Sequence, residues 1–192
     1  MKCWVFSTFN GLIFVSFTNS GNTLSSKLSY FPYTFKYPSK ISAWACDLNS
    51  ASLFFSSTDV VLIIAGFINA DAVVEELKKY NGEIAIICAG WKSRISLEDQ
   101  LCAGYIIRKL MQGNLPDNAR DGARMAFVIS EKYENQITEI VHLSNHAMRL
   151  IELGYETDIA YCSKLNTTTV IPVLKEGTLI NDNGSEKSNT VR

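Results

Sequence analysis

The sequence predicts a three-layer α/β/α fold with a largely parallel sheet, preceded by an N-terminal β-hairpin. Two alternations of an apolar run with an amphipathic segment predict these layers, at residues 59–65 and 70–80 and again at 84–89 and 97–112. Each apolar run is short and nearly unbroken, which is typical of a strand buried on both faces of a parallel sheet. This order predicts a right-handed crossover with both strand-to-helix junctions at one edge of the sheet.

The composition narrows the class of protein. With 192 residues and 47% hydrophobic content the chain can bury the core of one domain, and no apolar run reaches transmembrane length. Eighteen basic and nineteen acidic residues leave a net charge of -1, which argues against nucleic acid as a partner and favours a small molecule. Five widely spaced cysteines without a CxxC pair predict free thiols in a reducing cytoplasm.

The sequence predicts a β-rich segment over residues 1–57. The apolar flanks 3–9 and 12–17 surround an Asn-Gly pair, which is preferred in tight two-residue turns, and so predict the hairpin. Aromatic residues then alternate in an extended segment, namely Tyr33, Phe35 and Tyr37. We expect this aromatic face to pack in the core, and the alternative is an interface in a homo-oligomer. Residues 41–46 predict a further strand.

The first strand-to-helix junction follows residue 65. The strand over 59–65 ends at Gly66, and Asn69 is placed to cap the helix over 70–80. At the ligand edge of a sheet the Asn69 side chain could also approach a ligand. A helix cap and nothing more is the favoured interpretation of this residue taken alone.

The second junction predicts a helix start at the same edge. Gly90 ends the strand over 84–89, and Ser96 followed three residues later by Asp99 is the pattern of a capping box before a helix that begins at Leu97. This edge of an open parallel sheet collects ligands, and the unpaired amides of a helix start favour an anion.

Charged residues at the second junction predict a phosphate and metal site. Lys92 and Arg94 place two positive charges in the loop before the helix. Glu98 and Asp99 lie in the first helical turn, and neighbouring carboxylates can coordinate Mg²⁺ beside a phosphate. Ordinary helix chemistry is the competing interpretation, since acidic residues are favoured in a first turn without any ligand. Spacing alone favours that second interpretation.

Two further helices are predicted towards the C-terminus. One begins near residue 118, with small residues for close packing and Asp121 in its first turn. The other covers 135–154 and carries His142 and His146 four residues apart, a spacing that can bind a metal. No third ligand of metalloprotease type accompanies the pair, so we interpret both histidines as surface or capping groups.

The remaining residues predict two strands, at 158–162 and 169–174. The polar end at 181–192 predicts a disordered tail, which we place over residues 178–192. The chain is therefore divided into a divergent β-rich segment at 1–57, an α/β core at 58–177 and the tail.

A set of short motifs resembles one known family. The motifs are Gly66 with Asn69-Ala70, CAGWKSRISLEDQLCAG at 88–104, Asp121 before Gly122-Ala123, Ser144 with His146, Leu150, Gly154, Asp158 and Ile171-Pro172. Together they resemble the 2-phosphosulfolactate phosphatase family over about residues 58–177. The resemblance implies a magnesium-dependent acid phosphatase of coenzyme M biosynthesis that acts on a small phosphorylated hydroxyacid.

The resemblance and the second junction together predict a site. Glu98 and Asp99 are expected to hold Mg²⁺ and to serve catalysis. The residues expected to receive the phosphate are Asn69, Gly90, Lys92, Arg94 and Ser96.

Residues 1–57 depart from the family pattern. Family members begin with a strand that leads into a DVLRATTT-like segment containing an aspartate, and they later carry a TTTNGT-like turn. This chain opens with the predicted hairpin and has Ala45 to Ser50 at the turn position. The alternative function is therefore a catalytically degenerate member that binds an anion or associates with itself.

Overall fold

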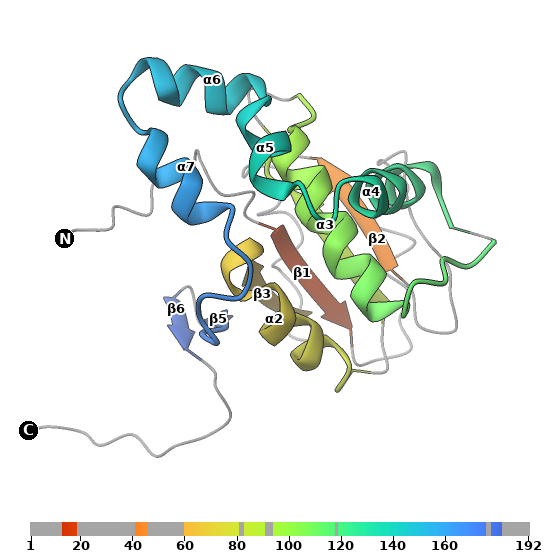
Figure 1. The fold of residues 1–192 in the computed structure, drawn as a ribbon. Helices are drawn as coiled ribbons and strands as arrows, with labels where there is room; N and C mark the ends of the chain where they lie inside the picture. The colour runs from red at the N-terminus through yellow and green to blue at the C-terminus, as the bar shows by residue number, and fades with distance from the viewer. Residues whose placement is uncertain are drawn as a thin grey trace, which may run out of the picture.

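The computed structural model describes residues 13–18, 41–45, 60–80, 83–90, 94–117, 119–175 and 178–181. Within these residues a six-stranded sheet is accompanied by helices, so the predicted combination of helix and sheet is confirmed (Figure 1). None of the helices in these ranges is long and apolar enough to cross a membrane. The aromatic segment around Phe35 lies outside the described residues.

The sheet is mixed rather than parallel. Its strands are β1 (Ile13–Thr18), β2 (Ile41–Ala45), β3 (Val60–Ala65), β4 (Glu83–Cys88), β5 (Pro172–Lys175) and β6 (Thr178–Asn181), in the order β2-β4-β1-β3-β5-β6. Only β2 and β4 pair in parallel, and the other four pairs are antiparallel. The prediction of a largely parallel sheet is therefore wrong. An apolar run reports that a strand is buried and says nothing of the direction of its neighbours.

The first described strand accounts for this difference. β1 lies between β3 and β4 and pairs antiparallel with both along all six of its residues. A strand has only two edges, so no edge of β1 is left for residues 3–9. The predicted N-terminal hairpin is wrong for this reason, although residues 3–9 themselves lie outside the described residues.

The helices are η3 (Phe67–Asn69), α2 (Ala70–Leu77), α3 (Leu97–Leu110), α4 (Asp121–Lys132), α5 (Ile137–His142), α6 (Asn145–Glu152) and α7 (Glu156–Cys162). α2, α3 and α4 pack side by side on one face of the sheet, against β3, β4 and β2 respectively (Figure 1). Fully buried side chains at helical spacing, such as Val73, Leu77, Leu101 and Ile106, form the core between these layers. The described residues thus confirm one helical layer, and the third layer stays a prediction.

α3 and α4 cross at very short range. A Cβ atom on Gly104 would lie 1.9 Å from the carbonyl oxygen of Ala126 and 2.7 Å from Cβ of Ser130, so only glycine allows this contact. Ala123 and Ala126 are fully buried, which confirms that the small residues of α4 serve close packing. α3 also contacts β4 and β1 of the sheet. The helix that follows the second junction is therefore held between α4 and the sheet.

Two segments differ in type from their predictions. The single helix predicted over 135–154 is divided into α5 and α6, because Ser144 accepts a hydrogen bond from the Ala147 amide at 3.0 Å and begins a new helix. The strand predicted over 158–162 is the helix α7, in which Ile159 is fully buried and its neighbours Asp158 and Ala160 are exposed. Five residues of apolar alternation were too short to distinguish the two structures.

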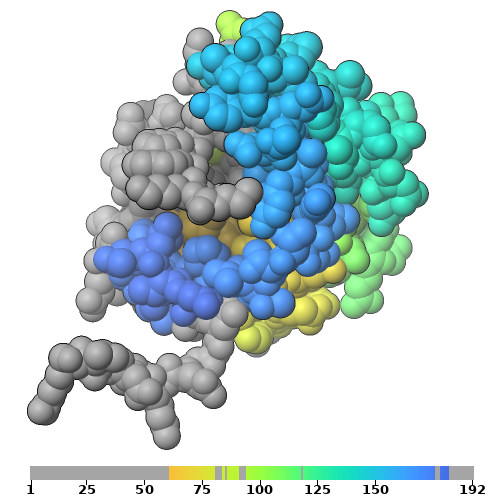
Figure 2. Space-filling view, turned by 60° about the vertical axis from the view of Figure 1, so that its left-hand side comes forward, coloured from red at the N-terminus to blue at the C-terminus, as the bar shows by residue number. Residues whose placement is uncertain are grey.

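The C-terminal strands extend the sheet beyond β3, because β5 pairs with β3 and β6 pairs with β5. The strand predicted over 169–174 is confirmed as β5, while β6 lies within the segment predicted as a tail. Between α7 and β5 the chain runs along η3, where the Asn166 amide donates to the Phe67 carbonyl at 2.9 Å and the Thr168 amide donates to the Ile68 carbonyl at 3.0 Å. Figure 2 shows this blue connection on the surface, next to the yellow α2.

Candidate functional site

Two strand-to-helix junctions meet at one edge of the sheet. Ala65 at the end of β3 and Cys88 at the end of β4 both lie opposite Ile13 of β1, and Ala45 at the end of β2 lies opposite Cys88. The prediction of a shared edge is therefore confirmed, although β1 separates the two junctions. Residues that follow β3 and β4 are brought to the same side of the molecule.

At the first junction the buried side chain of Asn69 hydrogen-bonds the surrounding backbone. Its Oδ1 accepts a hydrogen bond from the Gly66 amide at 2.8 Å, and its Nδ2 donates to the carbonyls of Ile64 at 3.2 Å and Val170 at 3.0 Å. Asn69 occupies the predicted N-cap position of α2, but its side chain makes no capping bond to that helix and instead completes the capping box of η3. Both amide hydrogens are donated to backbone oxygens, which leaves this side chain no N–H group for a phosphate.

The second junction turns tightly before α3. Gly90 has a φ of +67°, and a Cβ atom there would lie 2.6 Å from the carbonyl oxygen of Arg94. The Gly90 amide donates to Oδ2 of Asp99 at 2.6 Å. α3 begins at Leu97 as predicted, but the Ser96 hydroxyl caps no amide. Asp99 was expected in a capping box. Its carboxylate instead binds the Gly90 amide and so holds the loop after β4.

The electrostatics of Asp99 follow from its burial. The side chain is 2% exposed, and burial raises its pKa from an ordinary 3.8 to about 7, with the charge of Glu98 adding to the increase. The Gly90 amide lowers the pKa, and the nearby Ser96 hydroxyl also lowers it, although Ser96 Oγ makes no hydrogen bond of standard geometry within the described residues. Near neutral pH Asp99 can thus hold or release a proton.

One carboxylate oxygen of Glu98 is buried without a hydrogen-bond partner among the described residues. The Glu98 side chain is 8% exposed, and this oxygen is Oε2. A buried carboxylate oxygen without a partner is costly, so it points to a cation or a donor that satisfies it.

α6 contains a buried histidine that sequence reasoning misassigned. His146 is 3% exposed, so its interpretation as a surface or capping group is wrong. Burial lowers its pKa, and the Glu98 carboxylate acts in the opposite direction. The sequence held a signal for this burial, because Ala147 and Leu150 mark the same helical stripe as apolar. His142 lies apart on α5, where Nδ1 is 2.7 Å from the Thr138 carbonyl oxygen.

The remaining predicted residues lie around the loop. Arg94 is exposed and lies three residues before the start of α3. Lys92 lies outside the described residues. Within the described ranges no group of three or more His, Cys, Asp or Glu side chains could hold a metal ion. Mg²⁺ is often held by only one or two carboxylates together with water and substrate phosphate. Glu98 and Asp99 fit that donor set, since one buried oxygen of Glu98 has no partner there.

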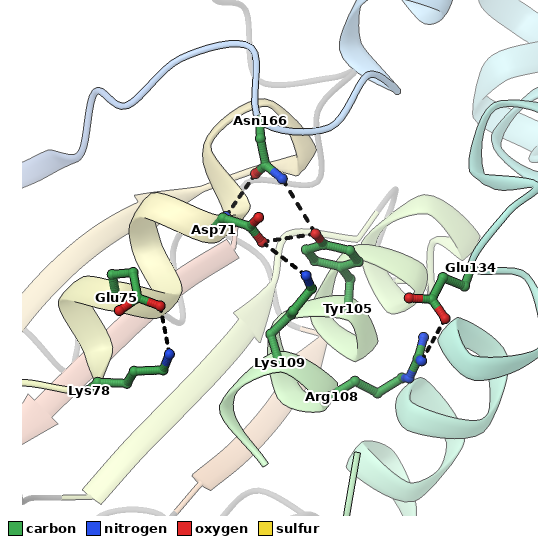
Figure 3. A network of polar contacts seen from close by, with 8 residues as sticks. All are labelled: Asp71, Glu75, Lys78, Tyr105, Arg108, Lys109, Glu134 and Asn166. Atoms are coloured by element: carbon green, nitrogen blue, oxygen red, sulfur yellow. Dashed lines mark hydrogen bonds and ion pairs between the residues drawn. The ribbon is translucent and has the colours of Figure 1, made fainter. Parts of the chain in front are cut away.

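A polar network joins the two helices that follow the junctions (Figure 3). The Tyr105 hydroxyl of α3 donates to Oδ1 of Asp71 in α2 at 2.8 Å, and Nδ2 of Asn166 donates to the Tyr105 hydroxyl at 3.4 Å. Oδ1 of Asn166 accepts the Asp71 amide at 2.8 Å, and Lys109 Nζ lies 3.8 Å from Asp71. The network fixes α2, α3 and the connection before β5 relative to one another. The apolar stripe of α3 predicted the burial of Tyr105 but not this contact.

Comparison with known proteins matches most of this chain to one family. Residues 50–177 match the family model described as 2-phosphosulpholactate phosphatase. This range contains both junctions, the short helix η3, the six described α-helices α2 to α7, and strands β3 to β5.

Curated relatives carry the same description. Proteins named probable 2-phosphosulfolactate phosphatase from Symbiobacterium thermophilum and Thermotoga maritima are 35% and 42% identical over 117 and 119 residues, which is 61% and 62% of this chain. One of the same name from Caldanaerobacter subterraneus subsp. tengcongensis is 30% identical over 154 residues, or 80% of this chain. The alignments cover 50%, 50% and 62% of these relatives, so the chain spans about half the length of the first two.

Proposed function

Because this chain belongs to the 2-phosphosulfolactate phosphatase family, we propose that it hydrolyses a small hydroxyacid phosphate monoester with Mg²⁺ at the start of α3. The relatives are named for a phosphorylated sulfolactate, and a compound of that class is the proposed substrate. The observation that carries the proposal is the buried pair Glu98 and Asp99 at the ligand edge, with one Glu98 oxygen lacking a partner among the described residues.

The two carboxylates account for a dependence on Mg²⁺. A phosphate that approached Glu98 and Asp99 directly would be repelled by like charge. Glu98 and Asp99 would hold the metal ion, which when bound would offset the negative charge that develops on the phosphate. Oδ2 of Asp99 accepts the Gly90 amide, so the loop after β4 orients this carboxylate.

Positive groups beside the carboxylates support phosphate binding. The first amides of any α-helix have no partner within the helix, and the helix dipole is positive there. α3 begins at Leu97, and Arg94 lies exposed three residues before it. We propose that these amides and Arg94 bind the phosphate, with Lys92 as a further cation from the same loop.

The raised pKa of Asp99 should make the binding of Mg²⁺ depend on pH. Burial raises its pKa to about 7, and a carboxyl group must lose its proton before it can hold a cation. Binding of Mg²⁺ should therefore strengthen as the pH rises through about 7 and release a proton in doing so.

The proposal is tested by a phosphatase assay of the full chain with a panel of hydroxyacid phosphates, including 2-phosphosulfolactate, with and without Mg²⁺. We expect Mg²⁺-dependent release of phosphate. Glu98→Gln and Asp99→Asn should each lower kcat/KM by at least about 100-fold, because a bound metal contributes several kcal/mol to the reaction. Glu139→Gln, an exposed acid of α5, is the matched control and should retain full activity.

Full activity in both site variants would exclude the roles given to these carboxylates. Binding of phosphate without turnover of any substrate in the panel would instead favour the alternative, a family member that binds an anion and does not hydrolyse it.

A further inference from the structure

The connection between α7 and β5 is bound to the first junction through its backbone. The Asn166 amide donates to the Phe67 carbonyl of η3 at 2.9 Å. Two residues later the Thr168 amide donates to the Ile68 carbonyl at 3.0 Å. Because η3 directly follows β3, the connection lies over the end of that strand at the ligand edge of the sheet.

The same connection supplies the cap of α2. Asn69 occupies the N-cap position but makes no capping bond to this helix. Instead, Oδ1 of Asn166 accepts the amide of Asp71, the second residue of α2, at 2.8 Å. Nδ2 of Asn166 donates to the Tyr105 hydroxyl of α3 at 3.4 Å (Figure 3). One side chain thus joins the connection to both helices that follow the junctions.

Asn166 adopts an uncommon backbone conformation to make these contacts. Its φ is +56°, in the left-handed region that residues other than glycine seldom occupy and that asparagine tolerates best. Such a conformation persists only while surrounding contacts hold it, and it is typical of clamps and switch segments. The contacts of Asn166 therefore decide the path of the whole connection.

The connection has anchored ends and an exposed middle. Ser163 and Ile171 are 3% and 7% exposed. Between them only Leu165 and Thr168 are partly buried, and the other residues of 164–170 are exposed. A segment with so little apolar burial and with exposed hydrogen bonds opens at a lower free energy than the sheet beneath it.

We propose that residues 164–170 form a strap over the first junction: the strap opens and closes as one unit while the sheet stays folded, and Asn166 is the latch that holds it closed. Opening breaks both bonds to η3 and the bond from Asn69 to the Val170 carbonyl, and it removes the cap of α2. It thereby exposes the first junction, which lies at the same edge of the sheet as the second. The inference does not depend on the proposed hydrolysis.

Amide hydrogen exchange of the full chain, resolved by residue with NMR spectroscopy, tests the strap. The amides of Asn166, Thr168 and Asp71 each donate in a bond that opening would break. If the strap opens as one unit, these three amides have the same protection factor. That factor should be at least about 100-fold lower than the protection factor of the Ile63 amide, in a fully buried residue of β3.

Two substitutions test the latch. Asn166→Gly removes both side-chain contacts, and glycine adopts a positive φ without strain. We expect it to lower the protection of Thr168 and Asp71 together, by about 10- to 100-fold. Tyr105→Phe removes one hydroxyl from the network and should lower the same protection by about 3- to 10-fold. Thr167→Ala, at an exposed neighbour in the strap, is the matched control and should leave the exchange unchanged.

Equal protection of the strap amides and of Ile63 would show that the strap opens only when the whole protein unfolds, and would overturn the inference. Loss of protection at Asp71 alone in Asn166→Gly would also overturn it, because Asn166 would then be a helix cap and not a latch. The comparison with Ile63 uses the unaltered protein, so it decides the question even if a variant does not fold. A protein that showed the expected exchange without phosphatase activity would support the strap and overturn only the proposed function.

Discussion

The two strand-to-helix junctions occupy equivalent places in the sheet but satisfy their polar groups differently. At the first, Asn69 is 5% exposed and makes three hydrogen bonds to backbone groups. At the second, Glu98 and Asp99 are buried to a similar extent. There Oε2 of Glu98 has no hydrogen-bond partner within the described ranges, and burial raises the pKa of Asp99 to about 7.

The difference shows that burial of a polar side chain does not by itself mark a functional residue. Both N–H groups of the Asn69 side chain are paired with backbone carbonyls. These hydrogen bonds stabilise the folded protein and leave no donor for a ligand. The carboxylates of the second junction remain unfavourable in the folded protein until a cation or a proton reaches them. We therefore propose that the first junction is structural and that the second carries the chemistry.

The largest expected effect tests the second junction through pH. Asp99→Asn keeps an acceptor for the Gly90 amide but cannot ionise. The pKa of Asp99 is 3.8 in an ordinary setting and about 7 here, so its contribution to stability is fully present below about pH 4 and is lost as the pH rises through about 7. The variant should exceed the unaltered protein in free energy of unfolding by up to about 4 kcal/mol above pH 7.

Urea denaturation with a metal chelator, at several pH values, measures this difference. Taking the difference between the two proteins cancels the titration of the groups that do not interact with Asp99. A difference that stays constant between about pH 4 and about pH 8 would show that Asp99 does not carry a buried charge. The variant should be the more stable and the less active protein, a combination that is typical of a functional site.

The second prediction tests the first junction. Asn69→Ala removes the partners of the Gly66 amide and of the carbonyls of Ile64 and Val170. We expect a loss of about 3 kcal/mol in the free energy of unfolding, because buried backbone groups are left without hydrogen bonds. The affinity for Mg²⁺ should not change in the protein that remains folded. Urea denaturation and calorimetry measure the two quantities.

Asn114→Ala is the control for Asn69→Ala. The Asn114 side chain donates to the Gln112 carbonyl in an exposed turn, where water can replace the bond, so the expected loss is under about 0.5 kcal/mol. Equal effects of the two substitutions would remove the structural role assigned to Asn69.

Sequence reasoning located the elements around both junctions because each is a sufficiently long periodic run. The start of α3 at Leu97 and the end of the preceding strand near Gly90 were predicted from the apolar pattern and local breakers. The position of β1 between β3 and β4 was not predictable in this way. Strand order depends on contacts between distant residues, and the apolar run of β1 is compatible with either direction of its neighbours.

Within the candidate site, residue types were predictable and contacts were not. Ser96 and Asp99 have the spacing of a capping box, but Asp99 accepts the Gly90 amide because the tight loop brings that amide to it. His146 was misassigned because Ser144 divides the predicted helix and turns the residues after it towards the core. Both errors arise where a local pattern competes with a contact made by the folded chain.

The smallest expected effect compares the two glycines that follow the strands. Gly90→Ala should lower the free energy of unfolding by about 2 kcal/mol, because φ is +67° and the new Cβ would lie 2.6 Å from the Arg94 carbonyl oxygen. Gly66 has an extended φ of -156° and no heavy atom of the described residues within 4 Å of an added Cβ.

Gly66→Ala should therefore be neutral or stabilise the protein by roughly 0.5 kcal/mol through the unfolded state. Chemical denaturation of the two variants side by side measures the contrast. Only Gly90→Ala should also weaken Mg²⁺ binding, since the Gly90 amide orients Asp99 and the Gly66 amide binds Asn69. If both substitutions had the same effect on stability and on Mg²⁺ affinity, the two junctions would be equivalent, and the assignment of chemistry to the second alone would be lost.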